Sequence, residues 1–243
     1  MAVVAIVQAR MGSSRFPGKM VADLGPWPLV EWVLARTAKA ISLDKVILAT
    51  SDKPRDDVLC SVADRLQVEV FRGDEDDVLG RYSAAARAAN ATTVVRICGD
   101  RPLVDPAVID LAVKEYCAGG ADLTFNHIPD GNENWPRGFG AEVLSASLLH
   151  EMAEGVDDPY HREHVTSFLW NDRTRHHIRP APCPVNIDPG FAGLRLDVDE
   201  QEDLDLLQKI LPAPDLAVSA EAVIAAWRRL GSETDAFPPE RST

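Results

Sequence analysis

The sequence of 243 residues has few cysteines and no long apolar run. Its four cysteines are far apart in the chain, a spacing that fits neither a zinc site nor a small disulfide scaffold: Cys60, Cys98, Cys117 and Cys183. We therefore expect reduced thiols and a cytoplasmic protein. No apolar run reaches the roughly 20 residues that cross a bilayer, and residues 2–7 lack the basic start and cleavage site of a signal peptide. We expect no membrane partner.

Positive charge is scarce as well. There are 25 Lys and Arg against 38 Asp and Glu, which gives a net charge of −13. Nonspecific nucleic-acid binding needs a basic surface, so we expect no nucleic-acid partner. A phosphate site would have to be locally positive against this field. The apolar fraction of 46% suffices for a full core, and the length predicts one large domain or one domain with an appendage.

Short apolar runs alternate with helical patterns through the first half of the chain. This alternation predicts an α/β fold, a Rossmann-like and mostly parallel sheet with helices on both faces. The strands are expected at 3–7, 46–49, 68–71, 94–97 and 123–125. The helices are expected at 29–40, 56–66, 77–89 and 106–117.

The alternation breaks at residues 126–140, a long polar stretch of a kind that is usually functional. Beyond it we expect strands at 141–144, 176–178 and 194–199. Helices are expected at 146–153, 159–170, 200–211 and 220–230, the last with Ser219 as its N-cap. We divide the chain into a domain of residues 1–212 and a C-terminal helix with a tail, residues 213–243.

The first expected strand leads directly into a loop with two glycines, two arginines and a lysine, residues 9–19, which we call the cationic loop. Small residues leave backbone N–H groups accessible, and such groups with cations beside them can bind a triphosphate. The loop follows the carboxyl end of a parallel strand, which is where open α/β sheets bind ligands. The loop is not a Walker A motif, because five residues separate Gly12 from Gly18 and Met20 follows Lys19. The G-x-G-x-x-G dinucleotide fingerprint is also missing from this turn. A solvated basic turn is the alternative interpretation.

A carboxylate follows the fourth expected strand, on the same sheet edge as the cationic loop. Gly99 allows close approach of a ligand, and Asp100 facing a triphosphate loop is the expected magnesium ligand. The alternative for Asp100 is a turn or a helix cap. For Asp105, which precedes Pro106, the capping interpretation is the preferred one.

A second acidic cluster lies late in the chain. Asp197 and Asp199 would share one face of a strand, and either could be the second metal ligand. Asp199 could also cap the next helix, with Glu202 completing a capping box. Asp100 and one of these two acids could together bind one magnesium ion. The ion would then lie beside the phosphate that is attacked, where negative charge develops during the reaction.

Two histidines lie three residues apart on an expected helix. His161 and His164 could share a face, but neither an H-E-x-x-H pattern nor a third ligand accompanies them, so zinc is disfavoured. We expect Arg162 and His164 to face an anionic group and Glu163 to hold an arginine in place.

The end of the long polar stretch, residues 136–143, combines a glycine-flanked turn with a glutamate on an expected strand. We interpret Gly138 and Glu142 as part of the wall of a second-substrate pocket. An ordinary joint between a loop and a strand is the alternative.

Residues 8–19, 49–52, 71–79, 96–103, 138–143, 162–166 and 198–204 together resemble a known family. The chain looks like the nucleotidyltransferases of spore coat polysaccharide biosynthesis, relatives of the 3-deoxy-manno-octulosonate and acylneuraminate cytidylyltransferases. The resemblance spans residues 3 to about 211. It implies a nucleotide-diphospho-sugar transferase fold and Mg²⁺-dependent transfer of CMP from CTP to an anionic sugar or sugar acid. Pyrophosphate would leave, and the chain would form a homodimer.

The same resemblance implies roles for individual residues. Arg15, Lys19 and Asp100 would act in catalysis, and Asp100 and Asp199 would hold the Mg²⁺. The residues that would bind the nucleotide are Ala9, Arg10, Gly12, Ser13, Ser14, Lys19, Thr50, Ser51, Asp77, Arg96 and Gly99. The residues that would bind the acceptor are Arg101, Gly138, Glu142, Arg162, Glu163 and His164. Arg101 stands where the family has an acidic or uncharged residue, which adds a cation near the site.

Two other functions compete with nucleotidyl transfer. A glycosyltransferase that uses a nucleotide sugar usually shows a D-x-D pair on this type of sheet. Asp197-Val198-Asp199 has that spelling but falls late in the chain. A non-catalytic nucleotide-binding protein is the third possibility, against which the presence of Lys19 and Asp100 argues.

Overall fold

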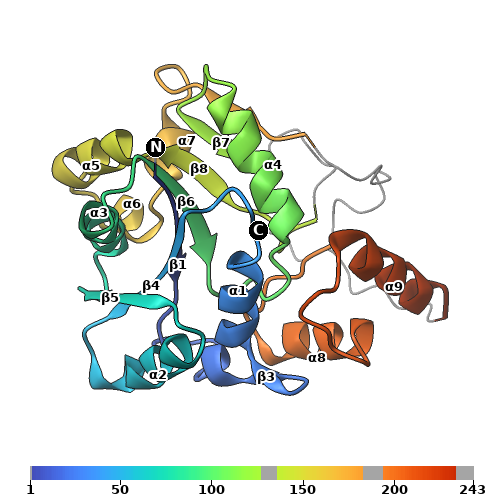
Figure 1. Ribbon diagram of the computed structural model, residues 1–243. Coiled ribbons are helices and arrows are strands. Elements are labelled where there is room, and N and C mark those ends of the chain that lie inside the picture. The colour runs from blue at the N-terminus through green and yellow to red at the C-terminus, as the bar shows by residue number, and fades with distance from the viewer. Residues whose placement is uncertain (1, 127–135, 183–193, 234–243) are drawn as a thin grey trace.

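A central sheet organises the computed structural model, which describes residues 2–126, 136–182 and 194–233. The strand order of this sheet is β5-β4-β1-β6-β8-β7-β9 (Figure 1). Strand β8 runs antiparallel to both of its neighbours, whereas the other pairs are parallel. The strands are β1 (Val3–Gln8), β4 (Lys45–Ser51), β5 (Glu69–Gly73), β6 (Thr93–Cys98), β7 (Leu123–Phe125), β8 (Glu142–Ser145) and β9 (Ile178–Pro180).

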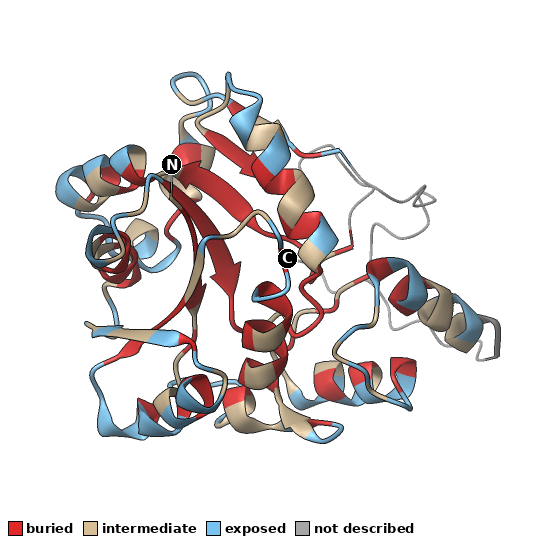
Figure 2. Cartoon of the chain, viewed as in Figure 1, coloured by how far each residue is buried: buried red, intermediate tan, exposed pale blue. Residues whose placement is uncertain are grey.

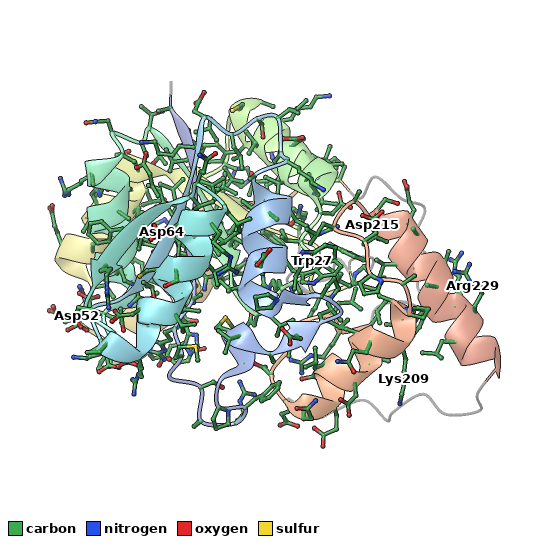
Figure 3. All side chains as sticks on the ribbon, turned by 60° about the horizontal axis from the view of Figure 1, so that its bottom comes forward. Trp27, Asp52, Asp64, Lys209, Asp215 and Arg229 are labelled. Atoms are coloured by element: carbon green, nitrogen blue, oxygen red, sulfur yellow. The ribbon has the colours of Figure 1, made fainter. Side chains whose placement is uncertain are left out.

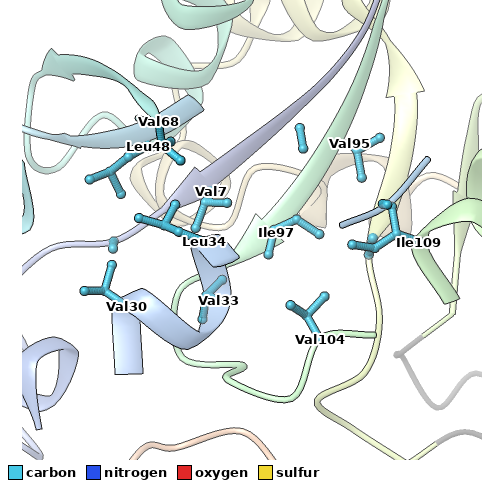
Figure 4. Packing of buried hydrophobic residues seen from close by; sticks show 14 of the residues in the cluster. Val7, Val30, Val33, Leu34, Leu48, Val68, Val95, Ile97, Val104 and Ile109 are labelled. Carbon is cyan, nitrogen blue, oxygen red and sulfur yellow. The ribbon is translucent and has the colours of Figure 1, made fainter. Parts of the chain in front are cut away.

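Helices cover both faces of the sheet, which is why the inner strands are mostly apolar. In β1, Val3, Ala5 and Val7 pack in one cluster and Val4 and Ile6 in another, because successive side chains point to opposite faces. The first face is covered by α1 (Leu29–Thr37), α2 (Asp57–Arg65) and α4 (Pro106–Cys117). Figure 4 shows Leu34 of α1 and Ile109 of α4 among the side chains of this cluster. The second face is covered by α3 (Val78–Ala88), α5 (Ala146–Gly155) and α7 (Ser167–Asn171).

A third apolar cluster joins the C-terminal helices to the main body. It packs α8 (Gln201–Ile210) and α9 (Ala220–Glu233) against a small hairpin, β2 (Asp23–Leu24) and β3 (Trp27–Pro28), which the sequence analysis did not predict. Figure 2 shows the buried inner faces of both helices, and Lys209 and Arg229 lie on their exposed sides (Figure 3). The backbone N–H of Ala220, at the start of α9, donates to Asp105 Oδ2 (2.8 Å). These contacts hold residues 213–233 against the rest of the described chain.

The predicted alternation of strands and helices is confirmed through β7, and Asp105 caps α4 as expected. The predicted helix at 159–170 is wrong: it is two helices, α6 (Pro159–Glu163) and α7, because His164 leaves the helical region with φ −101° and ψ 54°. The predicted strand at 194–199 is also wrong. That segment makes a single bridge, between Arg137 and Arg195, since no strand continues beside it among the described residues.

Smaller corrections concern the start of one strand and the end of one helix. Strand β9 begins two residues later than the start expected at residue 176, and α9 continues past Gly231 to Glu233. Residues 127–135 of the long polar stretch, and residues 234–243 of the predicted tail, lie outside the described residues. In the part of the chain that the structure describes, no helix combines the length and apolar character needed to cross a membrane.

Candidate active site

The strand order reverses at β1, whose neighbours are β4 and β6. In such sheets the loops after the two central strands diverge and leave a crevice for ligands. Here those loops are residues 9–19 after β1 and residues 99–105 after β6. They meet at Gly99, whose N–H donates to Gln8 O (2.8 Å) and where a Cβ atom would lie only 2.6 Å from the same oxygen. Glycine is therefore required at residue 99.

A cleft of about 790 Å³ opens at this point. It brings together most of the site residues predicted from the sequence. The predicted residues that line the cleft are Ala9, Arg10, Gly12, Ser13, Ser14, Arg15, Lys19, Arg96, Gly99, Asp100, Arg101, Glu142, Glu163, His164 and Asp199. Those that do not line it are Thr50, Ser51, Asp77, Gly138 and Arg162.

Thr50 and Ser51 lie beneath the cationic loop and are fully buried. Their hydroxyls donate to Asp56 Oδ2 at 2.9 and 2.6 Å, while the N–H of Met11 in the loop donates to Asp56 Oδ1 at 2.8 Å. Burial alone would raise the pKa of Asp56, but the hydrogen bonds from Ser51, Met11 and Thr50 lower it. Asp56 therefore anchors the loop to the sheet. The sequence analysis missed this role, because the partners are distant from Asp56 or from one another in the chain.

Asp77 and Arg162 pair with each other outside the cleft. Asp77 caps α3 through the N–H of Gly80 (2.8 Å), and its two oxygens accept from Arg162 Nε and Nη2 at 2.9 and 2.7 Å. Arg162 also donates to the carbonyls of Ala153 and Val156. The expectation that Arg162 faces an anion in the cleft is thus corrected: its guanidinium joins α6 to α3 and α5.

Gly138 also lies outside the cleft, where it shapes the backbone. Its φ of +115° belongs to the region that glycine favours, and a Cβ there would approach Leu196 Cβ to 2.6 Å. This close approach lets residues 136–139 lie beside residues 194–198, with the Leu196 N–H donating to Arg137 O at 2.9 Å.

The centre of the cleft holds one ammonium group between two carboxylates. Lys19 Nζ lies 3.1 Å from Asp199 Oδ1 and 3.7 Å from Asp100 Oδ2, and it donates to Val198 O at 2.8 Å. Arg15 Nη2 approaches the same Asp199 oxygen to 3.1 Å. The two acids predicted from distant segments therefore converge on one cation.

Asp197 also lines the cleft, but Arg195 occupies its carboxylate, with contacts at 3.3 and 3.0 Å. Burial would raise the pKa of Asp197, yet the hydrogen bond and charge of Arg195 hold it below its usual value. The predicted capping box on α8 is wrong in its residues. Glu200 is the N-cap and Asp203 completes the box, which leaves the Asp199 carboxylate directed at Lys19.

A buried ion pair forms part of the lining on the side of β6 and β8. Arg96 pairs with Glu142, and Thr166 Oγ1 donates to Glu142 Oε1 at 2.8 Å. Burial would lower the pKa of Arg96, but Cys98 and Glu142 raise it, so the guanidinium stays charged. The prediction that Glu163 holds an arginine is confirmed, because Glu163 Oε1 lies 2.7 Å from Arg10 Nη2.

Two further guanidinium groups line the cleft, those of Arg101 and Arg137. Within the described ranges, neither guanidinium forms a hydrogen bond or an ion pair. Arg101 is close enough to Asp197 to lower the pKa of that carboxylate. Arg137 was missed as a site residue, because it follows a long polar stretch and only the fold brings it to the cleft.

His161 contacts Ser167 Oγ (2.7 Å) rather than a metal-ligating group. Among the residues that the structure describes, no three His, Cys, Asp or Glu side chains gather as a metal cage would require.

The fold and the cleft together define a class of protein: an α/β enzyme whose cationic loop and convergent acids face one crevice at the reversal of strand order. Residues 4–175 match the family model described as cytidylyltransferase. The chain belongs to this cytidylyltransferase family, and it is a nucleotidyltransferase enzyme.

Similar proteins agree with this assignment. The spore coat polysaccharide biosynthesis protein SpsF of Bacillus subtilis is 32% identical over 228 residues, covering 89% of this chain and 91% of that protein. A solved cytidylyltransferase from Leptospira borgpetersenii has a TM-score of 0.86 at 27% identity, covering 100% and 98% of the two chains. CMP:2-keto-3-deoxy-manno-octonic acid synthetase complexed with CTP shares the fold, with a TM-score of 0.66 at 15% identity over 87% of this chain and 99% of that one.

Proposed function

We propose that this chain transfers CMP from CTP to an anionic sugar or sugar acid in the synthesis of a surface polysaccharide or glycoconjugate. An oxygen of the acceptor attacks the α-phosphorus of CTP. The bond between that phosphorus and the oxygen that bridges it to the β-phosphorus breaks, and pyrophosphate leaves with this oxygen. The convergence of Asp100 and Asp199 on Lys19, beside the cationic loop, carries this proposal. The CTP complex of a structural neighbour and the polysaccharide role in the name of SpsF support it.

The loop after β1 supplies the triphosphate site of this proposal. Its cations Arg10, Arg15 and Lys19 line the cleft together with Gly12 and the two serines that follow it. Cationic side chains and backbone N–H groups are the donors that bind phosphate oxygens most strongly. Because Asp56 anchors Met11 from beneath, the loop is held in place before the nucleotide binds.

The acids of the cleft fit a divalent ion. Asp100 Oδ1 is buried without a hydrogen-bond partner in the described part of the chain, and its other oxygen shares a cation with Asp199. Two carboxylates are the usual protein contribution to a Mg²⁺ site that phosphates and water complete. An ion held there would neutralise charge on the phosphates during transfer. We therefore propose Asp100 and Asp199 as its ligands.

We propose where the acceptor binds in the cleft from the positive charges that line it. Arg101 and Arg137 both line the cleft without an ion pair to a described residue. A cation that lacks a protein partner inside a cleft is well placed to bind a carboxylate or phosphate of a substrate. Glu142 holds Arg96 in the same wall, and His164 lines the cleft as well. An acceptor with an acidic group fits this arrangement.

Pyrophosphate release tests the function. The purified chain is incubated with CTP, Mg²⁺ and a panel of sugar acids and sugar phosphates that includes 3-deoxy-manno-octulosonate. We expect release with at least one acceptor, loss of release in Asp100→Asn, and no change in the control Asp52→Asn, whose side chain is 62% exposed. Wild-type release by Asp100→Asn would remove that carboxylate from the mechanism. No release with any acceptor would contradict the function.

A homodimer and a cytoplasmic location complete the proposal. They rest on the family resemblance and on the spacing of the cysteines. Light scattering on the purified chain tests the first, and a mass of 26.5 kDa in solution would contradict it.

A further inference from the structure

Lys19 occupies the space between the two acids that are proposed as metal ligands. It lies on the first loop, while Asp100 follows β6 and Asp199 precedes α8, so three distant segments meet there. The side chain of Lys19 is only 11% exposed, and those of Asp199 and Asp100 are 17% and 30% exposed. Its ammonium is therefore a tethered cation, held by the chain at the proposed metal site.

We propose that Lys19 gates metal entry. Without a nucleotide, its ammonium competes with a divalent ion for Asp100 and Asp199. A bound triphosphate draws the ammonium away, so the metal binds well only together with the nucleotide. This inference rests on the proposed function, because it takes the same two acids as metal ligands.

Electrostatics gives the reason for the competition. A dication and an ammonium group cannot both lie between the same two carboxylates, because they repel each other strongly at contact distance in a poorly solvated site. Phosphate oxygens offer Lys19 charged acceptors in place of Asp199 Oδ1 and Val198 O. By thermodynamic linkage, a nucleotide that displaces Lys19 raises the affinity for the metal, and the metal raises the affinity for the nucleotide.

The surrounding cations predict a graded effect. Arg15 also reaches Asp199 Oδ1, at 3.1 Å, but its side chain is 63% exposed and makes no ion pair with Asp100 among the described residues, so it competes less. Arg10 lines the same cleft and carries the same charge, yet it pairs with Glu163. Arg10 is therefore the matched control for the loss of one positive charge from the cleft.

The experiment measures Mn²⁺ binding to the nucleotide-free protein, from the electron paramagnetic resonance signal of the free ion. We expect Lys19→Met to raise the Mn²⁺ affinity about tenfold or more, within the usual range of coupling between two sites. Arg10→Met should change it by less than about threefold, since only the general field changes. Arg15→Met should fall between the two.

Two further measurements assign the effect to this site. Asp100→Asn in the Lys19→Met background should abolish the gain in Mn²⁺ affinity. In the wild type, CTP should strengthen Mn²⁺ binding by a larger factor than it does in Lys19→Met. Lys19→Gln serves as a second variant, and circular dichroism verifies that each variant is folded.

The gate is contradicted if nucleotide-free Mn²⁺ affinity stays the same or falls in both Lys19→Met and Lys19→Gln. It is also contradicted if Arg10→Met raises the affinity as much as Lys19→Met does. If the wild type still releases pyrophosphate from CTP, either result contradicts the proposed role of Lys19 in metal binding and leaves the proposed function standing. Failure of the wild type to bind CTP would instead overturn the proposed function.

Discussion

The substitution Asp56→Asn should lower the free energy of unfolding. It should also weaken the hydrogen bonding that holds the cationic loop to the sheet. The carboxylate of Asp56 is fully buried and accepts four hydrogen bonds, at 2.8 Å from Met11 N, 2.9 Å from Thr50 Oγ1, and 3.1 and 2.6 Å from Ser51 N and Oγ. An asparagine retains one acceptor oxygen. If that oxygen replaces Oδ2, the amide NH₂ faces the Met11 N–H, and two donors then oppose each other.

The magnitude follows from these bonds. The hydroxyls of Thr50 and Ser51 can rotate to suit an amide, but the backbone N–H of Met11 cannot, and a buried donor left without a partner costs about 1–3 kcal/mol. The loss of charge weakens the bonds that remain, each worth about 1.5–3 kcal/mol when the acceptor is ionised. We expect the free energy of unfolding to fall by about 2–4 kcal/mol, with CTP binding weakened as well.

Urea unfolding at neutral pH measures the first effect, and calorimetric titration with CTP measures the second. Asp57→Asn is the matched control: the next residue in the chain carries the same charge, but its side chain is 63% exposed and pairs with Arg72. We expect its unfolding free energy to stay within about 0.5 kcal/mol of the wild type. If Asp56→Asn were no less stable than Asp57→Asn, the anchoring of the loop by Asp56 would be refuted.

The pKa of Asp56 is lowered by folding, so its stabilisation should be complete above the pKa of the unfolded chain and be lost as the pH falls through the folded pKa. Melting temperatures from pH 7 to pH 3 should therefore fall less for Asp56→Asn than for the wild type; parallel curves would contradict this. Glu142→Gln should cost about 3–5 kcal/mol, because it leaves the buried charge of Arg96 without its partner. Urea unfolding tests this cost, and Arg96→Met combined with Glu142→Met should recover part of it. Arg101→Gln should raise the KM for the acceptor about tenfold and leave the KM for CTP unchanged, since a charged hydrogen bond contributes about 1.5–3 kcal/mol; steady-state kinetics would contradict the acceptor role if only the KM for CTP rose.

Apart from the β2–β3 hairpin, the order of strands and helices through β7 could be predicted from the sequence, because the inner strands contain apolar runs and the helices show their own period. The convergence of Asp100 with the loop after β1 was predictable for a similar reason: the carboxyl ends of parallel strands share one edge of the sheet. The approach of Asp199 was expected from the acidic pattern and the family resemblance. Its geometry was not, since the segment from residue 194 is extended without forming a strand.

Tertiary contacts decided the features that could not be predicted. The helix expected at 159–170 breaks at His164, and Thr166 then donates to Glu142 on β8. Arg162 does not line the cleft, because its guanidinium pairs with Asp77, which is 85 residues away in the sequence. No local pattern indicates either partner.

The most direct test of the central claim is calorimetric binding of CTP, UTP, GTP and ATP, and of UDP- and GDP-sugars, each with and without Mg²⁺. The account predicts Mg²⁺-dependent binding of CTP in preference to the other three, and loss of that dependence in Asp100→Asn. Binding of UDP- or GDP-sugars with no binding of any triphosphate would contradict it and would favour a glycosyltransferase.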